Sequence, residues 1–275
     1  MKMHKMKSKS RSGVATIRRF SRAKAQGEVV VGEAVAFLRS LRDESADIVF
    51  LDPPFNLGKE YIPGKKSLDR QPEHSYRTWL FKVLYESTRV LKVGGALYLY
   101  HLPQWAMQLG AFLGENGDLA FQHWIAISMK NGFVRGNHLY PAHYALLMYT
   151  KGDPAVFRRP KLEPNKCRHC KKLIKDYGGY RSIIEEKGLN LSDFWEDLSP
   201  VRHANRKYRK ANELSPVLFD RVLGISGRKG GLYVDPFAGA GSGAVRAVAA
   251  GMRFAVCDLV RNNCSIICDR LDALD

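Results

Sequence analysis

The stretch of sequence that decides the fold reads Leu232-Tyr-Val-Asp235-Pro-Phe237-Ala-Gly239-Ala-Gly241-Ser242-Gly243. Its first residues predict a buried strand, its glycines predict a tight turn, and the small residues from Ala244 to Ala250 predict a helix. A glycine turn lets a ligand approach the backbone, and the helix N-terminus that follows favours an anionic group. The stretch therefore indicates a strand, a ligand-binding turn and a helix in succession.

A second strand is predicted at Arg253–Asp258, and its last residue lies nineteen positions after Gly239. That spacing suits a carboxylate that accepts hydrogen bonds from ribose hydroxyls. A glycine turn alone often serves only to pack a helix closely against a strand. The turn, the helix and the acid together favour a cofactor that contains a nucleoside.

Further strands and helices alternate around these two, which is typical of an α/β protein with a mostly parallel sheet. The seven predicted strands are Val29–Val31, Asp47–Leu51, Ala96–Tyr100, Phe121–Ser128, Ala145–Tyr149, Leu232–Asp235 and Arg253–Asp258. Helices are predicted at Glu33–Arg42 and Tyr76–Leu91, and the Gly94-Gly95 pair is expected to stop the second helix.

A second unusual strand exit reads Leu51-Asp52-Pro53-Pro54-Phe55-Asn56. Two consecutive prolines cannot continue a central strand, so they force the chain out of the sheet at its carboxyl edge, with Asp52 and Phe55 on a stiff turn. Ligands of α/β sheets bind at that edge. The alternative without a function is an ordinary Pro-Pro loop with a surface carboxylate. Two such strand exits in one sheet instead favour a shared ligand-binding site.

The chain divides into four parts on composition. A basic tail, expected to be disordered, covers residues 1–27, and the two halves of the α/β domain cover 28–150 and 201–275. Between the halves, residues 151–200 form a basic, loop-rich insertion with Pro160, Pro164 and the Gly178-Gly179 pair.

The charge balance points to a polyanionic partner. Lys and Arg number 44 and Asp and Glu 27, a net charge of +17 over 275 residues, which argues against a small cationic substrate. Nine of these cations lie in residues 1–25 without any acid, as expected for a solvated tail, for an arm that follows phosphates, or less readily for a transit peptide. No apolar run is long enough for a membrane span.

Five cysteines, an odd number without a secretory signal, predict reduced thiols and a cytoplasmic protein. Cys167 and Cys170 have only His169 and His203 nearby to complete a zinc site, so we expect a thiol pair and no metal. Asp193-Phe194-Trp195 is expected to anchor the insertion to its host, with contact to DNA as the alternative. The basic run from Arg202 to Lys210 suggests phosphate contact, with a solvated loop as the alternative.

With these two motifs the sequence resembles the amino-methylating DNA methyltransferases, which use S-adenosylmethionine. Asp52-Pro53-Pro54-Phe55 matches their Asp/Asn/Ser-Pro-Pro-aromatic catalytic motif, and Asp235-Pro-Phe237-Ala-Gly239-Ala-Gly241 matches their Phe-x-Gly-x-Gly cofactor motif. The catalytic motif comes first and an insertion separates the two, which is the circularly permuted order of the β class. The resemblance implies a Rossmann-like, seven-stranded class I methyltransferase fold in which the insertion is the target recognition region.

The same resemblance implies the roles of individual residues. Asp52, Pro53, Pro54 and Phe55 are the expected catalytic residues. The expected cofactor residues are Glu33, Lys210, Asp235, Pro236, Phe237, Gly239, Gly241, Ser242 and Asp258. Two of them depart from the family pattern, because Glu33 stands where the family has Asp after Gly, and Ala211 replaces the Pro that usually follows the lysine at position 210.

The chemistry of an amino group explains these roles. The lone pair of an exocyclic amine is delocalised into the base, and hydrogen bonds from the NH₂ to Asp52 and the Pro53 carbonyl would free it for direct displacement of a methyl group. Phe55 offers a ring against which a base flipped out of the duplex can stack. Because family members acting on adenine N6 carry Asp or Asn first in the motif, Asp52 favours adenine.

We therefore expect an N6-adenine DNA methyltransferase that binds double-stranded DNA and is not attached to a membrane, with a homodimer left open. The alternatives are an amino methyltransferase for cytosine N4 or for RNA, and a basic nucleic-acid-binding protein that keeps the fold without catalysis.

Overall fold

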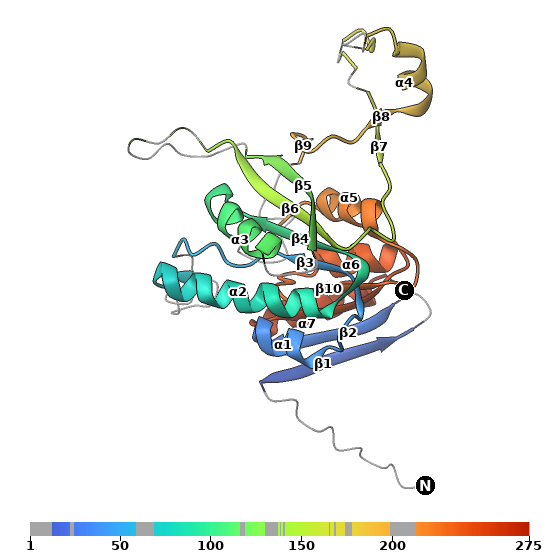
Figure 1. Ribbon diagram of the computed structural model, residues 1–275. Helices are drawn as coiled ribbons and strands as arrows, with labels where there is room; N and C mark the ends of the chain where they lie inside the picture. The colour runs from blue at the N-terminus through green and yellow to red at the C-terminus, as the bar shows by residue number, and fades with distance from the viewer. Residues whose placement is uncertain are drawn as a thin grey trace, which may run out of the picture.

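The computed structural model describes residues 13–22, 25–58, 69–115, 119–129, 137, 139, 141–164, 166–167, 169–173, 178–198 and 213–274. Its main feature is a nine-stranded sheet in the order β1-β2-β11-β10-β3-β4-β6-β5-β9 (Figure 1). The strands are β1 (Val14–Ser21), β2 (Gln26–Gly32), β3 (Ala46–Leu51), β4 (Leu91–His101), β5 (Leu119–Ser128), β6 (His143–Lys151), β9 (Phe194–Trp195), β10 (Leu232–Asp235) and β11 (Arg253–Asp258).

The seven predicted strands are confirmed and form one contiguous block, from β2 to β5. Within it β2, β11, β10, β3 and β4 pair in parallel, and β6 runs antiparallel between β4 and β5. The circular permutation is visible in the register, because β10 comes long after β3 in the sequence but pairs with it through Tyr233↔Ile48 and Val234↔Val49. The predicted Rossmann-like α/β class is thus confirmed.

Helices cover both faces of the sheet (Figure 1). Side chains alternate along β3, so that Ile48 and Phe50 enter one core and Val49 and Leu51 the other. The first core is closed by α5 (Pro216–Ser226), α6 (Ser242–Ala249) and α7 (Arg261–Asp272), and the second by α1 (Ala34–Ser40), α2 (Glu73–Val90) and α3 (Pro103–Glu115). Burial on both faces explains why the predicted strands read as nearly continuous apolar runs.

The predicted end of the second helix at Leu91 agrees with the structure to within one residue, but the stopping role predicted for Gly94-Gly95 is wrong. Helix α2 ends at Val90 and strand β4 begins at the next residue, so both glycines lie inside the strand. Gly94 has a φ of +77°, and a Cβ there would lie 2.7 Å from the Cβ of Ala155. This glycine therefore serves a close approach between two segments and does not stop a helix.

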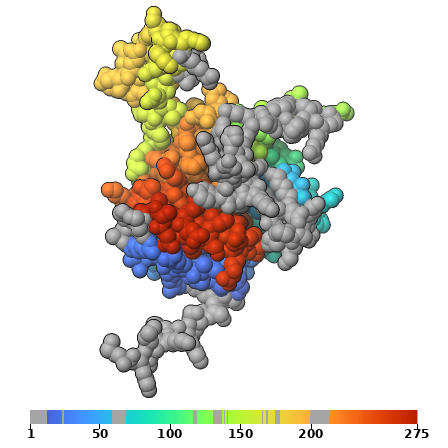
Figure 2. Space-filling model, turned by 180° about the vertical axis from the view of Figure 1, so that it is seen from behind, coloured from blue at the N-terminus to red at the C-terminus, as the bar shows by residue number. Residues whose placement is uncertain are grey.

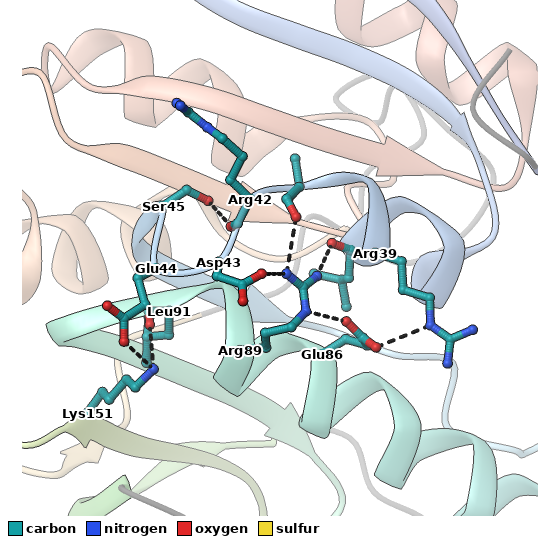
Figure 3. Close-up of polar contacts among 11 residues, drawn as sticks. Arg39, Arg42, Asp43, Glu44, Ser45, Glu86, Arg89, Leu91 and Lys151 are labelled. Carbon is teal, nitrogen blue, oxygen red and sulfur yellow. Dashed lines mark hydrogen bonds and ion pairs between the residues drawn. The ribbon is translucent and has the colours of Figure 1, made fainter. Parts of the chain in front are cut away.

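Arg89, near the end of α2, holds the loop between α1 and β3 (Figure 3). The guanidinium of Arg89 donates to the Leu38 and Leu41 carbonyls over 2.8 and 3.2 Å, and it pairs with Glu86 over 2.7 Å and with Asp43. These contacts fasten the end of α1 and the loop after it to the last turn of α2. The loop thereby delivers β3 to the sheet with a fixed register.

The predicted tail boundary at residue 27 is also wrong, because Val14–Ser21 forms strand β1, paired antiparallel with β2. Arg18 and Arg22 bind the carboxylate of Asp272 at the end of α7, and Phe20 is buried against Phe254. Basic composition favours a tail, but the apolar residues Val14, Ile17 and Phe20 join the two cores. Residues 1–12 lie outside the described part of the chain.

The insertion projects away from the sheet (Figures 1 and 2). It contains the two-stranded sheet of β7 (Lys161–Leu162) and β8 (Leu189–Asn190), with α4 (Arg181–Lys187) between them, and α4 has no buried residue. Trp195 returns to the body, where it is buried under the guanidinium of Arg221. The predicted anchoring role is confirmed for Trp195, whereas Phe194 is 53% exposed.

Candidate active site at the switch point of the sheet

Strand order reverses between β10 and β3. From β10 the chain continues through α6 to β11 on one side, and from β3 it continues through α2 to β4 on the other. Open α/β sheets bind ligands in the crevice outside the carboxyl ends of the strands at such a point. Both predicted motifs leave the sheet here, so the structure brings the expected catalytic and cofactor residues together.

The glycine turn after β10 is held by hydrogen bonds to the next strand. Ala238 N–H donates to the Cys257 carbonyl and Gly239 N–H donates to the Asp258 carboxylate, each over 2.9 Å. Gly239 and Gly241 have φ angles of +54° and +79°, and a Cβ on Gly241 would lie 2.6 Å from Ile267 Cγ1. Left-handed backbone with no room for a side chain explains why the turn needs glycine.

Asp258 is a brace for this turn. One carboxylate oxygen accepts from Gly239, and the other accepts from Val260 N–H over 2.8 Å and from Asn263 Nδ2 over 2.9 Å. The contact with ribose hydroxyls expected from its spacing stays a prediction. The spacing from Gly239 has a clear structural consequence, because it places the acid opposite the turn.

Asp235 is almost completely buried at the end of β10. It accepts hydrogen bonds from Phe237 N–H over 2.9 Å and from the Tyr233 hydroxyl over 3.1 Å. Burial, together with the charges of Asp52 and Asp258, raises the pKa of Asp235 to about 7. The interaction with Asp52 shows that the ends of the two motifs lie close to each other.

A second brace connects the turn to helices α1 and α2. The ring of Phe237 lies edge-on to that of Trp79, with 5.8 Å between their centroids, and Trp79 Nε1 donates to Glu33 Oε1 over 2.9 Å. The other Glu33 oxygen caps α1 by accepting from Ala36 N–H over 3.0 Å. Glu33 therefore sits beside the expected cofactor site, and its contact with the cofactor stays a prediction.

The remaining predicted cofactor residues are placed as follows. Pro236 is buried in the turn, and Ser242 is the first residue of α6, where its hydroxyl accepts from Arg270 Nη1 over 3.3 Å. Lys210 and the basic run from Arg202 to Lys210 lie outside the described residues.

The loop after β3, which carries the expected catalytic residues, is fixed by Asn56, whose φ is +58°. Its side chain and the backbone of Gln71 exchange two hydrogen bonds, of 2.7 and 2.9 Å, and its N–H donates to Asp69 Oδ1 over 2.8 Å. Pro53 is buried and Asp52 is half-buried. The Asp52–Phe55 loop is therefore a rigid exit from the sheet.

A directed chain of hydrogen bonds holds the second proline of the loop. Leu102 N–H donates to His101 Nδ1 over 2.8 Å, so the neutral ring carries its hydrogen on Nε2. Burial lowers the pKa of His101 to about 3, which keeps the ring neutral. Nε2 then donates to the Tyr76 hydroxyl over 2.8 Å, and that hydroxyl donates to the Pro54 carbonyl. The Pro54 carbonyl is thus already hydrogen-bonded within the protein.

Aromatic rings surround the end of the loop. Phe55 stacks on His101 with 4.8 Å between ring centroids, and it lies 5.9 Å from both Tyr100 and Tyr144. Tyr100 and Tyr144 are 5.1 Å apart, so Phe55, Tyr100 and Tyr144 form an aromatic triad. The charge of Asp52 adds to burial in raising the pKa of both tyrosines, which places Asp52 beside the triad.

Sequence reasoning missed Tyr76, Trp79, Tyr100, His101 and Tyr144. A usable signal existed for Tyr100 and His101, because both stand at the carboxyl end of the strand after the Asp-Pro-Pro strand. The others lie in the interior of α2 or at the start of β6, where nothing in their spacing separates a site residue from a core residue.

The cysteine pair of the insertion lies far along the chain from this site. Cys167 and Cys170 are free thiols, and the Cys167 pKa is lowered by hydrogen bonds from the backbone of Cys170 and His169. Among the described residues, no group of three or more His, Cys, Asp or Glu side chains is arranged to hold a metal. No helix in the described ranges is long and apolar enough to cross a membrane.

Comparison with known sequences identifies close relatives. M.BamHI, a type II methyltransferase of Bacillus amyloliquefaciens, is 41% identical over 250 residues, which cover 90% of this chain and 58% of the relative. M.HpaI of Haemophilus parainfluenzae is 27% identical over 215 residues, 78% of this chain and 64% of the relative. The chain thus spans less than two thirds of the length of either.

Solved structures share the fold. The PvuII DNA methyltransferase, described as cytosine-N4-specific, matches with a TM-score of 0.64 at 12% identity, covering 89% of this chain and 86% of that one. The M1.HpyAVI–SAM complex matches with a TM-score of 0.60 at 14% identity, covering 90% and 100%. At these identities the likeness concerns the fold alone.

The family model of the N6/N4 methyltransferases, described as DNA methylase, matches residues 46–269 and thus includes both motifs and the insertion. This match extends over most of the chain, and it agrees with the relatives, with the permuted order of the motifs and with their meeting at the switch point. The chain belongs to the N6/N4 amino DNA methyltransferase family.

Proposed function

We propose that this protein transfers a methyl group from S-adenosylmethionine to an exocyclic amino group of a DNA base, with adenine N6 as the acceptor. One observation carries the proposal: the Asp52–Phe55 loop and the Asp235–Gly243 turn leave adjacent strands at the same edge of the sheet. A donor held on the turn and an amine held on the loop would be neighbours there.

The residues at this edge suit the cofactor. Four neighbouring parallel strands have an acid at their carboxyl ends: Asp258 and Asp235 are the last residues of β11 and β10, and Glu33 and Asp52 directly follow β2 and β3. Their proximity is supported by Cys257, whose pKa is raised by burial and by the charges of Asp258, Glu33 and Asp235. In a chain of net charge +17, this acidic edge favours a cation such as a sulfonium.

S-adenosylmethionine, when bound, would supply an electrophilic methyl group. Within this proposal Glu33 and Asp258 would face its nucleoside, the backbone of Gly239 and Gly241 would admit it closely, and Phe237 would pack against it. These positions are inferred from where strands β2, β11 and β10 end.

The residues on the acceptor side would bind and activate the amino group. Asp52 and the Pro53 carbonyl would accept the two amino hydrogens, which reduces delocalisation of the nitrogen lone pair into the ring. The Pro54 carbonyl already accepts a hydrogen bond from Tyr76. The loop oxygens left for the base are therefore those of Asp52 and the Pro53 carbonyl. The nitrogen gains a methyl group and gives up one proton, for which the Asp52 carboxylate is the neighbouring acceptor.

Adenine N6 is favoured by Asp in the first position of the motif. Cytosine N4 is the second candidate, because Asp52 and the Pro53 carbonyl bind the amino group and not the ring that carries it. The relatives point in both directions: the Escherichia coli protein that is 24% identical over 233 residues is named a DNA adenine methyltransferase, and the PvuII enzyme is cytosine-N4-specific.

Double-stranded DNA is the proposed partner, with the target base flipped into the site. The insertion, residues 151–200, is the proposed reader of the sequence, since it projects from the body and exposes Tyr180, Ile183 and Phe194 (Figure 1). The exposed rings would suit contact with bases or sugars, and the surrounding Lys and Arg would suit phosphates.

The test is methyl transfer with labelled S-adenosylmethionine to unmethylated DNA, followed by hydrolysis to nucleosides and mass spectrometry. N6-methyladenine is the expected product. N4-methylcytosine would assign the second candidate instead. Label found only in RNA, or no label with protein that binds the cofactor, would contradict the proposal. Sequencing that detects modified bases then identifies the methylated site.

A further inference from the structure

Tyr100 differs from the other buried tyrosines of the structure. The hydroxyls of Tyr98, Tyr149 and Tyr233 bond to Ser226, to the Gly110 carbonyl and to Asp235, over 2.7, 3.0 and 3.1 Å. Tyr100 is only 5% exposed, yet its hydroxyl has no hydrogen-bond partner in the described part of the chain. Of these four hydroxyls, that of Tyr100 is therefore the one left to bond to a ligand or to water.

The Tyr100 hydroxyl is not sealed inside the core. Among the described residues, Ser87 Oγ is the one side-chain polar atom that is fully enclosed without a partner, so the Tyr100 oxygen keeps some surface accessible to solvent. The Tyr100 ring contacts Phe55 and Tyr144, which places this residue at the candidate active site. A polar group with free hydrogen-bonding capacity therefore lies beside the catalytic loop.

The hydroxyl is a donor under all ordinary conditions. Burial, together with the negative charge of Asp52, raises the pKa of Tyr100 well above 10. Asp52 is the neighbouring acceptor and Tyr100 the neighbouring donor. The site thus presents an acceptor and a donor side by side to whatever lies against the ring of Phe55.

That pair matches the Watson–Crick edge of only two bases. Adenine and cytosine offer an amino donor next to a ring nitrogen that accepts, N1 in adenine and N3 in cytosine. In guanine N1 and in thymine N3 the ring nitrogen carries a hydrogen, which would face the Tyr100 donor. The pairing therefore selects both bases that carry a Watson–Crick amino group next to an acceptor, and it rejects the other two.

We propose that the Tyr100 hydroxyl donates a hydrogen bond to the ring nitrogen next to the methylated amino group and is a specificity-determining residue of the site. This inference rests on the proposed function, since it needs a base in the pocket. It names the contact that holds the base ring, whereas Asp52 holds the amine.

The experiment removes the two partners separately and together. Tyr100→Phe deletes the hydroxyl, and a duplex with 1-deazaadenine at the identified target, or 3-deazacytosine if cytosine is the acceptor, deletes the ring nitrogen. In single-turnover methyl transfer, wild type should be slower on the deaza base by about tenfold, the worth of one hydrogen bond. Tyr100→Phe should transfer to the two duplexes at nearly equal rates, because the partner is already gone.

Tyr98→Phe is the matched control, since Tyr98 lies two residues earlier on the same strand and binds Ser226 away from the site. It should keep the wild-type preference for the normal base. An equal preference in wild type and Tyr100→Phe would overturn the inference while leaving the proposed function intact. Absence of transfer to any base by wild type would instead overturn the proposed function, and this inference with it.

Discussion

Asp52 is the residue on which the proposed chemistry depends most directly. Asp52→Ala should lower single-turnover methyl transfer by at least about a hundredfold, because the amine loses its charged acceptor. Affinity for S-adenosylmethionine, measured by calorimetry, should change little, since the turn is braced by Asp235 and Asp258. Transfer at a near-normal rate would remove Asp52 from the mechanism.

Asp235 should make stability depend on pH. Its pKa rises from an ordinary 3.8 to about 7 on folding, so the native state holds the proton more tightly than the unfolded state. Its contribution to stability is then fully present below about pH 4 and lost as pH rises through 7. Asp235→Asn keeps the shape without the charge, and it should exceed wild type in unfolding free energy at pH 8 by roughly 1–4 kcal/mol.

Denaturant unfolding at pH 4 and pH 8 measures this effect. The difference between the variant and wild type should shrink toward pH 4, where both carry an uncharged side chain at position 235. Ser226→Ala, which disturbs a buried hydrogen bond without a charge, is a control whose effect should stay constant with pH. A constant difference for Asp235→Asn would mean that the native carboxyl titrates normally.

Helix α2 holds the Asp52–Phe55 loop in place through the hydroxyl of Tyr76. Tyr76→Phe removes both the donor to the Pro54 carbonyl and the acceptor for His101 Nε2. We expect kcat to fall about tenfold, with KM for both substrates nearly unchanged. The hydrogen bonds of Asn56 should keep the loop folded, but the oxygens of the loop would be positioned less precisely. Tyr85→Phe, on the same helix with its ring 64% exposed, is the control.

An effect of Tyr76→Phe on KM alone would show that Tyr76 serves substrate binding and not loop geometry. Because His101 stays neutral down to about pH 3, its protonation should not appear in the pH dependence of kcat between pH 5 and 9. A new ionisation near pH 6 in Tyr76→Phe would indicate that the His101 ring has become accessible to water.

The seven strands were predictable from sequence because both faces of the sheet are covered, which makes each strand a short apolar run. Strand β1 was not, because its apolar residues Val14, Ile17 and Phe20 stand three positions apart and do not alternate, and its pairing with β2 shifts register between Thr16 and Arg18. The two motifs were predictable because proline and glycine leave a local signature. Tyr76 and Trp79 were not, since their partners, Pro54 and Glu33, lie more than twenty residues away in sequence.

Charge is distributed unevenly over the whole molecule. The net charge of +17 coexists with four acids at the carboxyl edge of the sheet, which suits a protein that binds a polyanion outside and a cationic cofactor within. Arg18 and Arg22 are committed to Asp272, so part of the basic excess in the first 25 residues serves the fold. The cations before residue 13 are the ones available for a test.

Deleting residues 1–12 should weaken DNA binding and flatten its dependence on salt. The deletion removes five cations, Lys2, Lys5, Lys7, Lys9 and Arg11, but keeps strand β1. For every phosphate that the protein no longer neutralises, the magnitude of the slope of log K against log salt decreases by about 0.9, so loss of five contacts would reduce it by up to about 4.5. Replacing the same five residues with Gln should have the same effect, because length is kept and only charge changes. A slope that stays the same in both variants would show that these residues do not contact DNA, and the remaining salt dependence would then be assigned to the insertion and the body.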